Sequence, residues 1–263
     1  MPTIATWNVN SIKSRLPHVL QYLDDAKPDV VLLQELKTIE DNFPFMEIEE
    51  KGYNIAAYGQ KTYNGVAILS KHPIEDVQKG LPGNEDDPQA RYIEAVITIE
   101  HEAWRVASVY VPNGQSPDSD KFPYKMGFLD CLEAHARTLL TYEEKLVIGG
   151  DYNVAPEPQD VYAPKQLEGS VCFHRDERAK YRKLIHLGLT DAYRAIHPQE
   201  ADMFSWWDYR GGGWQQNKGM RIDHLLLSPE AADSLKAADI DKTPRGWEKA
   251  SDHTPVWAEI ALS

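Results

Sequence analysis

Short runs of apolar residues alternate along this chain with longer segments in which apolar residues recur every three or four positions. A continuous apolar run of about four to eight residues is typical of a buried strand, and the three-to-four spacing is typical of a helix with one buried face. The chain therefore predicts alternating strands and helices, with strands in the majority. The expected strands are residues 3–8, 29–35, 65–70, 91–99, 104–111, 145–150, 221–228 and 254–261, and the expected helices are residues 15–26, 120–140 and 175–187.

This order of elements favours one α/β domain over residues 1–263. The length suffices for one large domain, and no low-complexity linker or short-period repeat divides the chain. Residues 91–99 and 104–111 are predicted to pair as a hairpin, and Ser11 is a candidate cap for the first helix. We expect a single-domain, four-layered α/β sandwich in which two packed β-sheets are flanked by helices.

Polar side chains stand at the ends of the predicted strands. In Leu146–Asn153 an apolar run is followed by Gly149 and Gly150, and then by Asp151 and Asn153. Ligands of α/β proteins bind beyond the carboxyl ends of strands, but these residue types are also common in turns, so this segment alone leaves a plain turn equally open. We interpret the glycines as room for a phosphate and a water molecule beside the backbone. The other strand ends carry Asn8, Glu35, Tyr110 with Asn113, Asp223, and Asp252 with His253.

These strand-end residues are mostly oxygen donors. No second histidine or cysteine lies at zinc-ligand spacing, so the set favours Mg²⁺ or Mn²⁺ over zinc. Glu35 and Asn8 could supply the few protein oxygens that Mg²⁺ takes, and Asp223 could orient His253 to carry or hold a proton. Such a set suits metal-assisted attack of water on a phosphoester. The chain contains neither a serine nucleophile elbow nor a phosphate-binding P-loop.

Composition and charge further narrow the possible classes of protein. The net charge of −13 argues against holding nucleic acid by bulk electrostatics, although a bound cation can offset acidic residues in an enzyme site. The two cysteines, Cys131 and Cys172, are far apart and fit a reducing cytoplasmic location. No signal peptide is evident, and no stretch approaches the roughly 18 apolar residues of a membrane span. We therefore expect a cytoplasmic protein that does not bind membranes, and nothing requires more than a monomer.

The order of the strand-end motifs resembles the endonuclease/exonuclease/phosphatase superfamily, and within it the bacterial exodeoxyribonuclease III and AP endonuclease family. The resemblance runs essentially from end to end. The motifs that carry it are Trp7-Asn8, Leu33-Gln34-Glu35, Tyr110-Val111-Pro112-Asn113, Gly150-Asp151-Tyr152-Asn153, Arg221-Ile222-Asp223 and Ser251-Asp252-His253-Thr254-Pro255. Segments that resemble the DNA-repair branch in particular are Gln89–Ala95, Phe204–Arg210 and Asn217–Asp223.

The resemblance implies catalytic roles for five residues. Asp151 would activate or orient the attacking water, and Asn153 would help to position that water and the phosphate. His253 would bind a phosphate oxygen and stabilise charge in the transition state, with Asp223 holding its imidazole. Tyr110 would contact the phosphate or assist the leaving group.

It also implies metal and substrate contacts. Glu35 would be the main metal ligand, Asn8 would support it, and Asp252 could take a second metal. An abasic sugar swings out of the helix at a lower unstacking cost than a full nucleotide, and an apolar pocket would accept it. The implied substrate contacts are Asn113, Arg91, Trp206, Met220 and Ile222. Weaker candidates for a basic rim toward DNA are Lys121, Lys125 and Arg210.

The function implied by the resemblance is that of a Mg²⁺-dependent DNA-repair nuclease, with Mn²⁺ as a possible substitute. Such an enzyme would cleave double-stranded DNA 5′ to abasic sites, and it would remove nucleotides from 3′ ends as a 3′-5′ exonuclease and blocking groups as a 3′-phosphatase or phosphodiesterase.

Two other functions stay open. A superfamily phosphatase or phosphodiesterase acting on lipids or small phosphoesters would share the site motifs, but Trp206-Trp207, Arg91 and the lack of a membrane-binding amphipathic stretch argue against it. A non-catalytic nucleic-acid-binding protein on the same fold should have lost site residues. Here the acidic residues and the histidine of the site are all present: Glu35, Asp151, Asp223 and His253.

Overall fold

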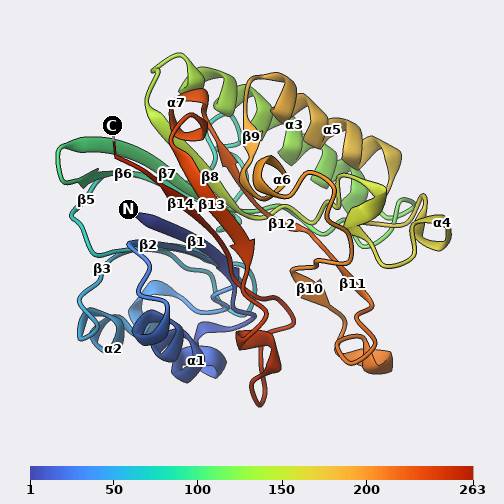
Figure 1. Ribbon diagram of the computed structural model, residues 1–263, viewed down its shortest axis with the longest axis horizontal. Coiled ribbons are helices and arrows are strands. Elements are labelled where there is room, and N and C mark those ends of the chain that lie inside the picture. Colours follow the sequence, from blue (N-terminus) through green and yellow to red (C-terminus); the bar gives the residue numbers. More distant parts are fainter. Residues whose placement is uncertain (263) are drawn as a thin grey trace.

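Two six-stranded sheets pack face to face in the computed structural model, which describes residues 1–262 (Figure 1). The first sheet has the order β13 (Leu235–Ile240), β14 (Val256–Ile260), β1 (Thr3–Asn8), β2 (Val30–Gln34), β4 (Val66–Ser70) and β3 (Asn54–Tyr58). The second has the order β5 (Ile74–Lys79), β6 (Tyr92–Ile99), β7 (Glu102–Tyr110), β8 (Lys145–Asp151), β12 (Asp223–Leu227) and β9 (Thr190–Asp191). A separate ribbon pairs β10 (Trp206–Trp207) with β11 (Gly219–Met220).

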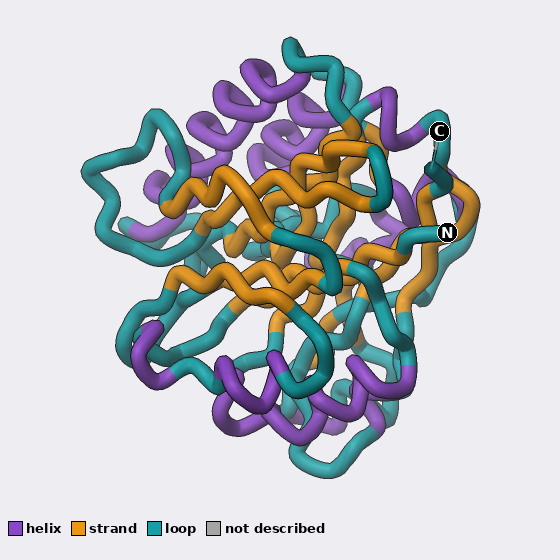
Figure 2. The backbone as a smooth tube through the Cα atoms, turned by 90° about the vertical axis from the view of Figure 1, so that its left-hand side faces the viewer, coloured by secondary structure: helices purple, strands orange, loops and turns teal. Residues whose placement is uncertain are grey.

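The two sheets share one connection pattern. Each has a parallel pair at its centre, β1 with β2 and β7 with β8, and antiparallel neighbours on both sides. The first pair is joined through α1 (Ile12–Asp25) and the second through α3 (Lys121–Leu140), as parallel strands require a crossover. Figure 2 shows the sheets stacked between helical layers. The remaining helices are α2 (Phe45–Glu49), α4 (Pro164–Leu167), α5 (Arg175–His186), α6 (Ala192–Ile196) and α7 (Pro229–Ala232). The expected four-layered sandwich is confirmed.

The central strands are buried on both faces, which is why they read as continuous apolar runs. Along β1, Ile4 faces the core between the sheets, whereas Ala5 and Trp7 pack in the outer core with Val19 and Leu23 of α1. A matching outer core lies between the second sheet and helices α3 and α5. Packing in the two outer cores holds α1 and α3 against the sheets. This packing also holds in place the strand ends that carry the polar residues.

Gly149 and Gly150 serve packing, and our interpretation of them as room for a phosphate is wrong. A Cβ on Gly149 would lie 2.6 Å from side-chain carbons of both Leu32 and Leu225, where the two sheets meet. A Cβ on Gly150 would lie 1.9 Å from the carbonyl oxygen of Val109 on the neighbouring strand. Both glycines are needed because no side chain fits between these strands and sheets.

The predicted strands and helices are all present, with ends shifted by up to three residues. The strands that the pattern did not predict are those at the four sheet edges, together with the β10–β11 ribbon. These edge strands are β3, β5, β9 and β13. Edge strands bury less surface, as β5 does with almost every residue exposed, so their apolar pattern is weak. Within residues 1–262, no helix combines the length and apolar character needed to cross a membrane.

Candidate active site

A pocket of about 340 Å³ opens where the carboxyl ends of β2, β7 and β8 meet the loop before β14. Most residues predicted for the site line this pocket. The exceptions are Asn8 and Asp223, which are buried behind it, and Arg91. The lining residues are Glu35, Tyr110, Asn113, Asp151, Asn153, Val171, Cys172, Trp206, Met220, Ile222, Asp252 and His253. Segments far apart in the sequence thus converge on one cavity.

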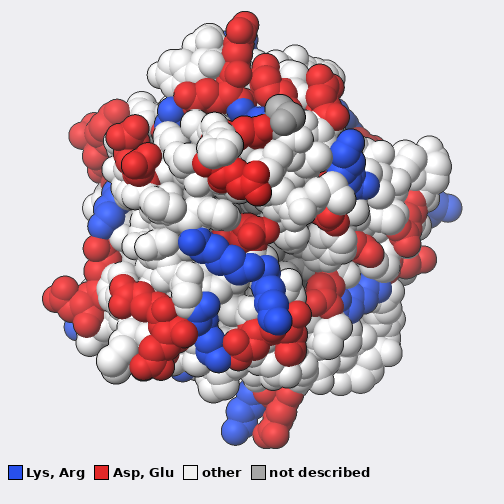
Figure 3. All heavy atoms as spheres, turned by 60° about the vertical axis from the view of Figure 1, so that its left-hand side comes forward, with Lys and Arg blue, Asp and Glu red and all other residues white. Residues whose placement is uncertain are grey.

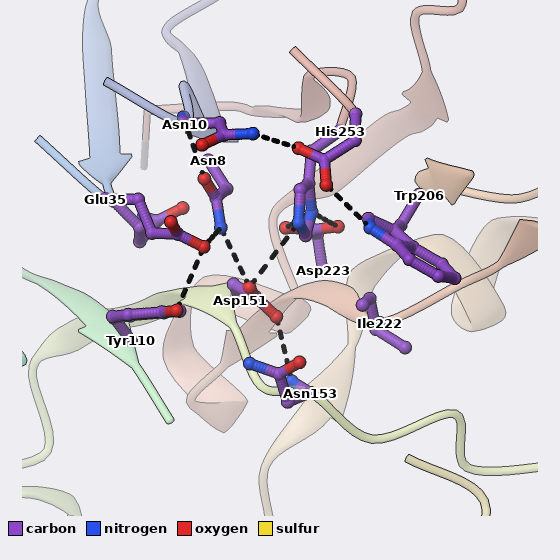
Figure 4. Close-up of polar contacts among 12 residues, drawn as sticks. Asn8, Asn10, Glu35, Tyr110, Asp151, Asn153, Trp206, Ile222, Asp223 and His253 are labelled. Carbon is purple, nitrogen blue, oxygen red and sulfur yellow. Dashed lines mark hydrogen bonds and ion pairs between the residues drawn. The ribbon is translucent and has the colours of Figure 1, made fainter. Parts of the chain in front are cut away.

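Asp151 and Asp223 lie directly opposite each other in the antiparallel pair of β8 and β12, with His253 beside both (Figure 4). The Nδ1 atom of His253 lies 2.9 Å from Asp223 Oδ2, and its Nε2 atom lies 3.7 Å from Asp151 Oδ2. The Ser205 hydroxyl donates to Asp223 at 2.6 Å, which fixes the carboxylate that orients the imidazole. The predicted partnership of Asp223 with His253 therefore agrees with the geometry.

Burial and charge shift the pKa values of the two groups that face the pocket. Burial raises the pKa of Asp151, and although the charge of His253 opposes the shift, the pKa reaches about 7. Burial alone would lower the pKa of His253, but the charges of Asp223 and Asp151 outweigh it and raise that pKa to about 10. At neutral pH the site therefore pairs a carboxyl poised to exchange a proton with an imidazolium that carries a fixed positive charge.

Asn8 joins two carboxylates through its amide nitrogen. The Nδ2 group donates to Glu35 Oε1 at 3.0 Å and to Asp151 Oδ2 at 2.9 Å. The Oδ1 atom instead accepts from the backbone N–H of Asn10. The Asn8 oxygen is therefore turned away from the two carboxylates, and the side chain supports them through its amide nitrogen.

Glu35 supplies the carboxylate best suited to a cation. Burial would raise its pKa, but the charge of Lys37 and the hydrogen bond from Asn8 outweigh burial and lower it, so the group is ionised. Potential ligand atoms of Glu35, Asp151 and His253 all lie within 4.8 Å of one another. Because protonated histidine has no free lone pair, the two carboxylates are the donors that fit an oxygen-preferring ion such as Mg²⁺.

Asp252 is engaged by protein donors. Its Oδ1 atom accepts from Asn10 Nδ2 at 2.9 Å, and its Oδ2 atom accepts from Trp206 Nε1 at 3.0 Å. These contacts tie the loop that carries His253 to the loop after β1 and to Trp206. They give Asp252 a role in shaping the site besides the second-metal role implied by the resemblance.

Tyr110 presents a phenol that stays protonated. Its hydroxyl donates to Glu35 Oε1 at 2.9 Å. Burial raises its pKa well above the usual range, and the charges of Glu35 and Asp151 add to the shift. The Arg91 guanidinium lies over the Tyr110 ring at 4.8 Å and donates to the Tyr110 carbonyl. Arg91 therefore orients Tyr110 from the rim and does not itself line the pocket.

Asn113 and Asn153 have their amides oriented by the protein. Asn153 Nδ2 donates to the Val111 carbonyl at 2.9 Å, and its Oδ1 accepts from Asn113 Nδ2 at 3.0 Å. The Oδ1 atom of Asn113 accepts from the backbone N–H of Gln115. One N–H of the Asn153 amide has no partner among the described residues, and the second N–H of Asn113 faces only the weak acceptor Cys172 Sγ at 3.7 Å, so both amides suit a phosphoryl oxygen.

The far end of the pocket is apolar. Trp206, Met220 and Ile222 line it as the resemblance implied, together with Val171 and Cys172, which the sequence reasoning missed. Val171 and Cys172 come from the loop before α5, which has no apolar periodicity and no strand-end motif to mark it. The pocket thus places charged and polar groups at one end and a wall without strong hydrogen-bonding groups at the other.

The expected basic rim is only partly present. Lys125 is fully buried in an ion pair, so it is not available to DNA, and that expectation is wrong. Arg210 is exposed and pairs with Asp208, and Lys121 is exposed at the start of α3. Figure 3 shows one face of the molecule, on which acidic side chains are widely scattered among uncharged ones. The acidity thus lies partly on the surface and is not confined to the pocket.

Comparison with known proteins gives consistent matches. The sequence model of a family described as the endonuclease/exonuclease/phosphatase family matches residues 5–253. Exodeoxyribonuclease III of Haemophilus influenzae is 35% identical over 263 residues, which cover 97% of this chain and 98% of the relative. Among solved structures, a 3′ phosphatase from Neisseria bound to a product DNA hairpin has a TM-score of 0.96 and 42% identity, and an AP endonuclease from Archaeoglobus fulgidus has a TM-score of 0.94 and 39% identity. Both alignments cover 100% of each chain.

Proposed function

Because the chain belongs to the endonuclease/exonuclease/phosphatase family, we propose that it is a metal-dependent DNA-repair nuclease that hydrolyses phosphoesters at abasic sites and at 3′ ends. Its relatives named exodeoxyribonuclease III and AP endonuclease are hydrolytic nucleases, and this chain is one as well. The substrate proposal is supported by the pocket, which is polar at one end and apolar at the other. Asp151 and His253 lie beside the apolar wall of Trp206, Met220 and Ile222.

The apolar wall favours a sugar without a base as the substrate group that enters the pocket. A base has hydrogen-bonding edges that would lose their partners against Trp206 and Ile222, whereas a bare or terminal sugar leaves fewer polar groups unpaired. Flipping an abasic sugar also costs less unstacking energy than flipping a full nucleotide. The residues proposed to carry the reaction already meet within one subunit, so we propose that a monomer suffices.

We propose that Glu35 holds the divalent ion, with an oxygen of Asp151 within reach. The ion is Mg²⁺, with Mn²⁺ as a substitute, since both prefer oxygen donors and leave coordination positions for water and phosphate. When bound, such an ion lowers the pKa of water and stabilises negative charge on a phosphoryl oxygen.

The side chains of the site have separate roles in the proposed reaction. Asp151 accepts a proton from the attacking water, for which a pKa of about 7 is suited. The imidazolium of His253, held by Asp223, points its Nε2 toward Asp151 and the pocket, where it stabilises the charge that develops on the phosphoryl oxygens. The water oxygen bonds to phosphorus as its proton passes to Asp151, the bond from phosphorus to the departing 3′ oxygen breaks, and that oxygen takes up a proton from solvent to become a 3′-hydroxyl. Tyr110 is the protonated donor beside the phosphate.

A second candidate substrate is supported by a specific likeness. The relative with a TM-score of 0.96 is named as a 3′ phosphatase. A terminal 3′ phosphate would present the same phosphoryl oxygens to His253 and the same bare sugar edge to the apolar wall. We therefore propose that this chain also removes a 3′ phosphate with the same residues.

The test uses two labelled duplexes, one with a single abasic analogue and one with a 3′-terminal phosphate, each in Mg²⁺ and in EDTA. We expect incision on the 5′ side of the analogue and release of phosphate, both abolished by EDTA. Inositol phosphates and sphingomyelin, added as competitors, should not reduce the rate. The proposal fails if neither duplex is cut in Mg²⁺, if EDTA has no effect, or if a competitor is the better substrate.

A further inference from the structure

A fully buried ion pair lies directly behind one wall of the pocket. Lys125 of α3 and Glu177 of α5 are both shielded from solvent, and Lys125 Nζ lies 2.5 Å from Glu177 Oε1. The ammonium also donates to the backbone carbonyls of Asn113 at 3.1 Å and of Asn153 at 2.6 Å. A lysine has three N–H donors, and all three are used here.

The carboxylate of Glu177 extends this contact to a third loop. Its Oε1 atom accepts from the backbone N–H of Cys172 at 3.1 Å, and its Oε2 atom accepts from that of His174 at 2.9 Å. The pair therefore joins the loops at residues 111–115, 152–155 and 172–174. Each of these loops contributes to the pocket lining, through Asn113, Asn153 or Cys172.

The backbone of these loops needs external support. Asn153 has a φ of +50° and Cys172 a φ of +68°, a region that side-chain-bearing residues rarely adopt without surrounding contacts. At Gly114 the loop passes so close to Lys125 that a Cβ there would lie 3.1 Å from the lysine Cδ. The ion pair and the aliphatic chain of Lys125 thus determine where the two asparagine amides lie.

We propose that Lys125 and Glu177 are positioning residues for catalysis, which hold the phosphate-facing amides of Asn113 and Asn153 and the pocket wall at Cys172 in their working places. This inference rests on the proposed function. Burying an ion pair is costly, and an apolar pair of similar volume often stabilises a protein as well or better. The contacts of this pair go to the backbone of pocket residues, which gives its presence a functional reason.

A matched control exists at the other end of β8. Lys145 is also buried, and its Nζ contacts Glu102 at 2.6 Å and the Ala261 carbonyl at 3.0 Å. It lies on the same strand as Asp151 but at the opposite end. Lys145→Met therefore removes a similar set of contacts without touching the pocket loops.

The experiment compares Lys125→Met, Lys125→Arg, the double variant Lys125→Met with Glu177→Gln, and Lys145→Met. The double variant leaves no unpaired buried charge and keeps an amide oxygen for the Cys172 N–H, so it should fold even if Lys125→Met alone does not. For each variant, kcat and KM are measured on the 3′-phosphate and abasic duplexes, below the unfolding temperature. Hydrogen exchange of the three loops is followed by mass spectrometry.

We expect the double variant to lose about tenfold to a hundredfold in kcat/KM, as displaced catalytic groups do, with faster exchange in all three loops. Lys125→Arg should recover most of the activity, and Lys145→Met should match the wild type in both measurements. A double variant that keeps wild-type kcat/KM overturns the proposal, whatever its stability. If the wild type cuts neither duplex, the proposed function fails, and unchanged loop exchange in the double variant would then overturn the positioning role independently.

Discussion

Asp151 and Asp223 face each other across β8 and β12 and hold one imidazole between them. Directly opposite residues of an antiparallel pair point to the same side of the sheet, so the register alone brings the two carboxylates together. Their shared neighbour, His253, is charged because of them. One pairing of strands thus provides a proton acceptor and a fixed positive charge side by side.

The pH dependence of kcat/KM should reflect this arrangement. Protonation of Asp151, whose pKa is raised to about 7, removes the proton acceptor, so activity should fall as the pH drops below that value. Loss of the proton from His253, whose pKa is raised to about 10, should produce the alkaline limb. Asp223→Asn removes a negative charge beside the imidazole, so we expect the alkaline limb to move to lower pH. An unmoved alkaline limb in this variant would refute the role given to His253.

Removal of the Tyr110 hydroxyl should lower turnover without unfolding the protein. The phenol donates one hydrogen bond to Glu35 at 2.9 Å, and a typical net contribution of such a bond to stability is about 1 kcal/mol. We expect Tyr110→Phe to reduce kcat by about tenfold to a hundredfold, because the protonated donor beside the phosphate is lost. The matched control is Tyr124→Phe, which removes a hydrogen bond to Asp87 outside the pocket lining. Equal kcat values for the two variants would contradict the assignment.

Gly150→Ala tests the account of the two glycines before Asp151. The new Cβ would fall 1.9 Å from the Val109 carbonyl oxygen, so we expect a large loss of stability or no folding. A Cβ added at Gly127, in α3, would meet no neighbouring side chain or strand within 4 Å, and Gly127→Ala should raise the free energy of unfolding by up to about 1 kcal/mol. Urea denaturation of both variants gives the comparison. A stable but inactive Gly150→Ala would restore the phosphate-access explanation.

His224 predicts a loss of stability in acid. It is fully buried, its Nδ1 accepts from Arg221, and its Nε2 donates to the Val154 carbonyl. Burial, together with the charge of Arg221, lowers its pKa to about 4. Between pH 6.5 and 4 the unfolded chain binds a proton here that the folded protein does not, so stability falls as the pH drops through this window, by about 3 kcal/mol from this group.

The variant His224→Gln isolates this effect, since glutamine can both accept and donate a hydrogen bond without titrating. We expect the difference in unfolding free energy between pH 6.5 and pH 4 to be smaller in the variant than in the wild type. Urea titrations at a series of pH values provide the measurement. Parallel curves for the two proteins would show that His224 does not couple folding to pH.

The sequence predicted the site residues best where a reactive side chain follows a strongly buried strand. Glu35 and Asp151 follow apolar strands that are buried on both faces, so pattern and motif pointed to the same strand ends. Lys125 shows the limit of this reasoning. A lysine on a helix is normally solvated, and only the tertiary approach of the loops at Asn113 and Asn153 explains its burial.

Other side-chain placements also depend on tertiary contacts. The Asn8 side chain could present either its oxygen or its nitrogen to the carboxylates, and the choice depends on the N–H of Asn10, which lies in a turn with positive φ. Cys172 lines the pocket from a loop whose conformation depends on Glu177, a residue five positions further along. Such placements arise from tertiary hydrogen bonds that residue spacing does not encode.

The measurement that most directly tests whether this cluster cleaves DNA is incision of the abasic duplex by wild type and Asp151→Asn, with Mg²⁺ restored stepwise to metal-free protein. We expect the wild type to regain activity in proportion to bound Mg²⁺. The variant should stay at least about a hundredfold slower at saturating metal, with a melting temperature equal to or above that of the wild type, because a buried carboxyl with a raised pKa is removed. Incision by the folded variant at the wild-type rate, or by the wild type without metal, would contradict the proposed chemistry.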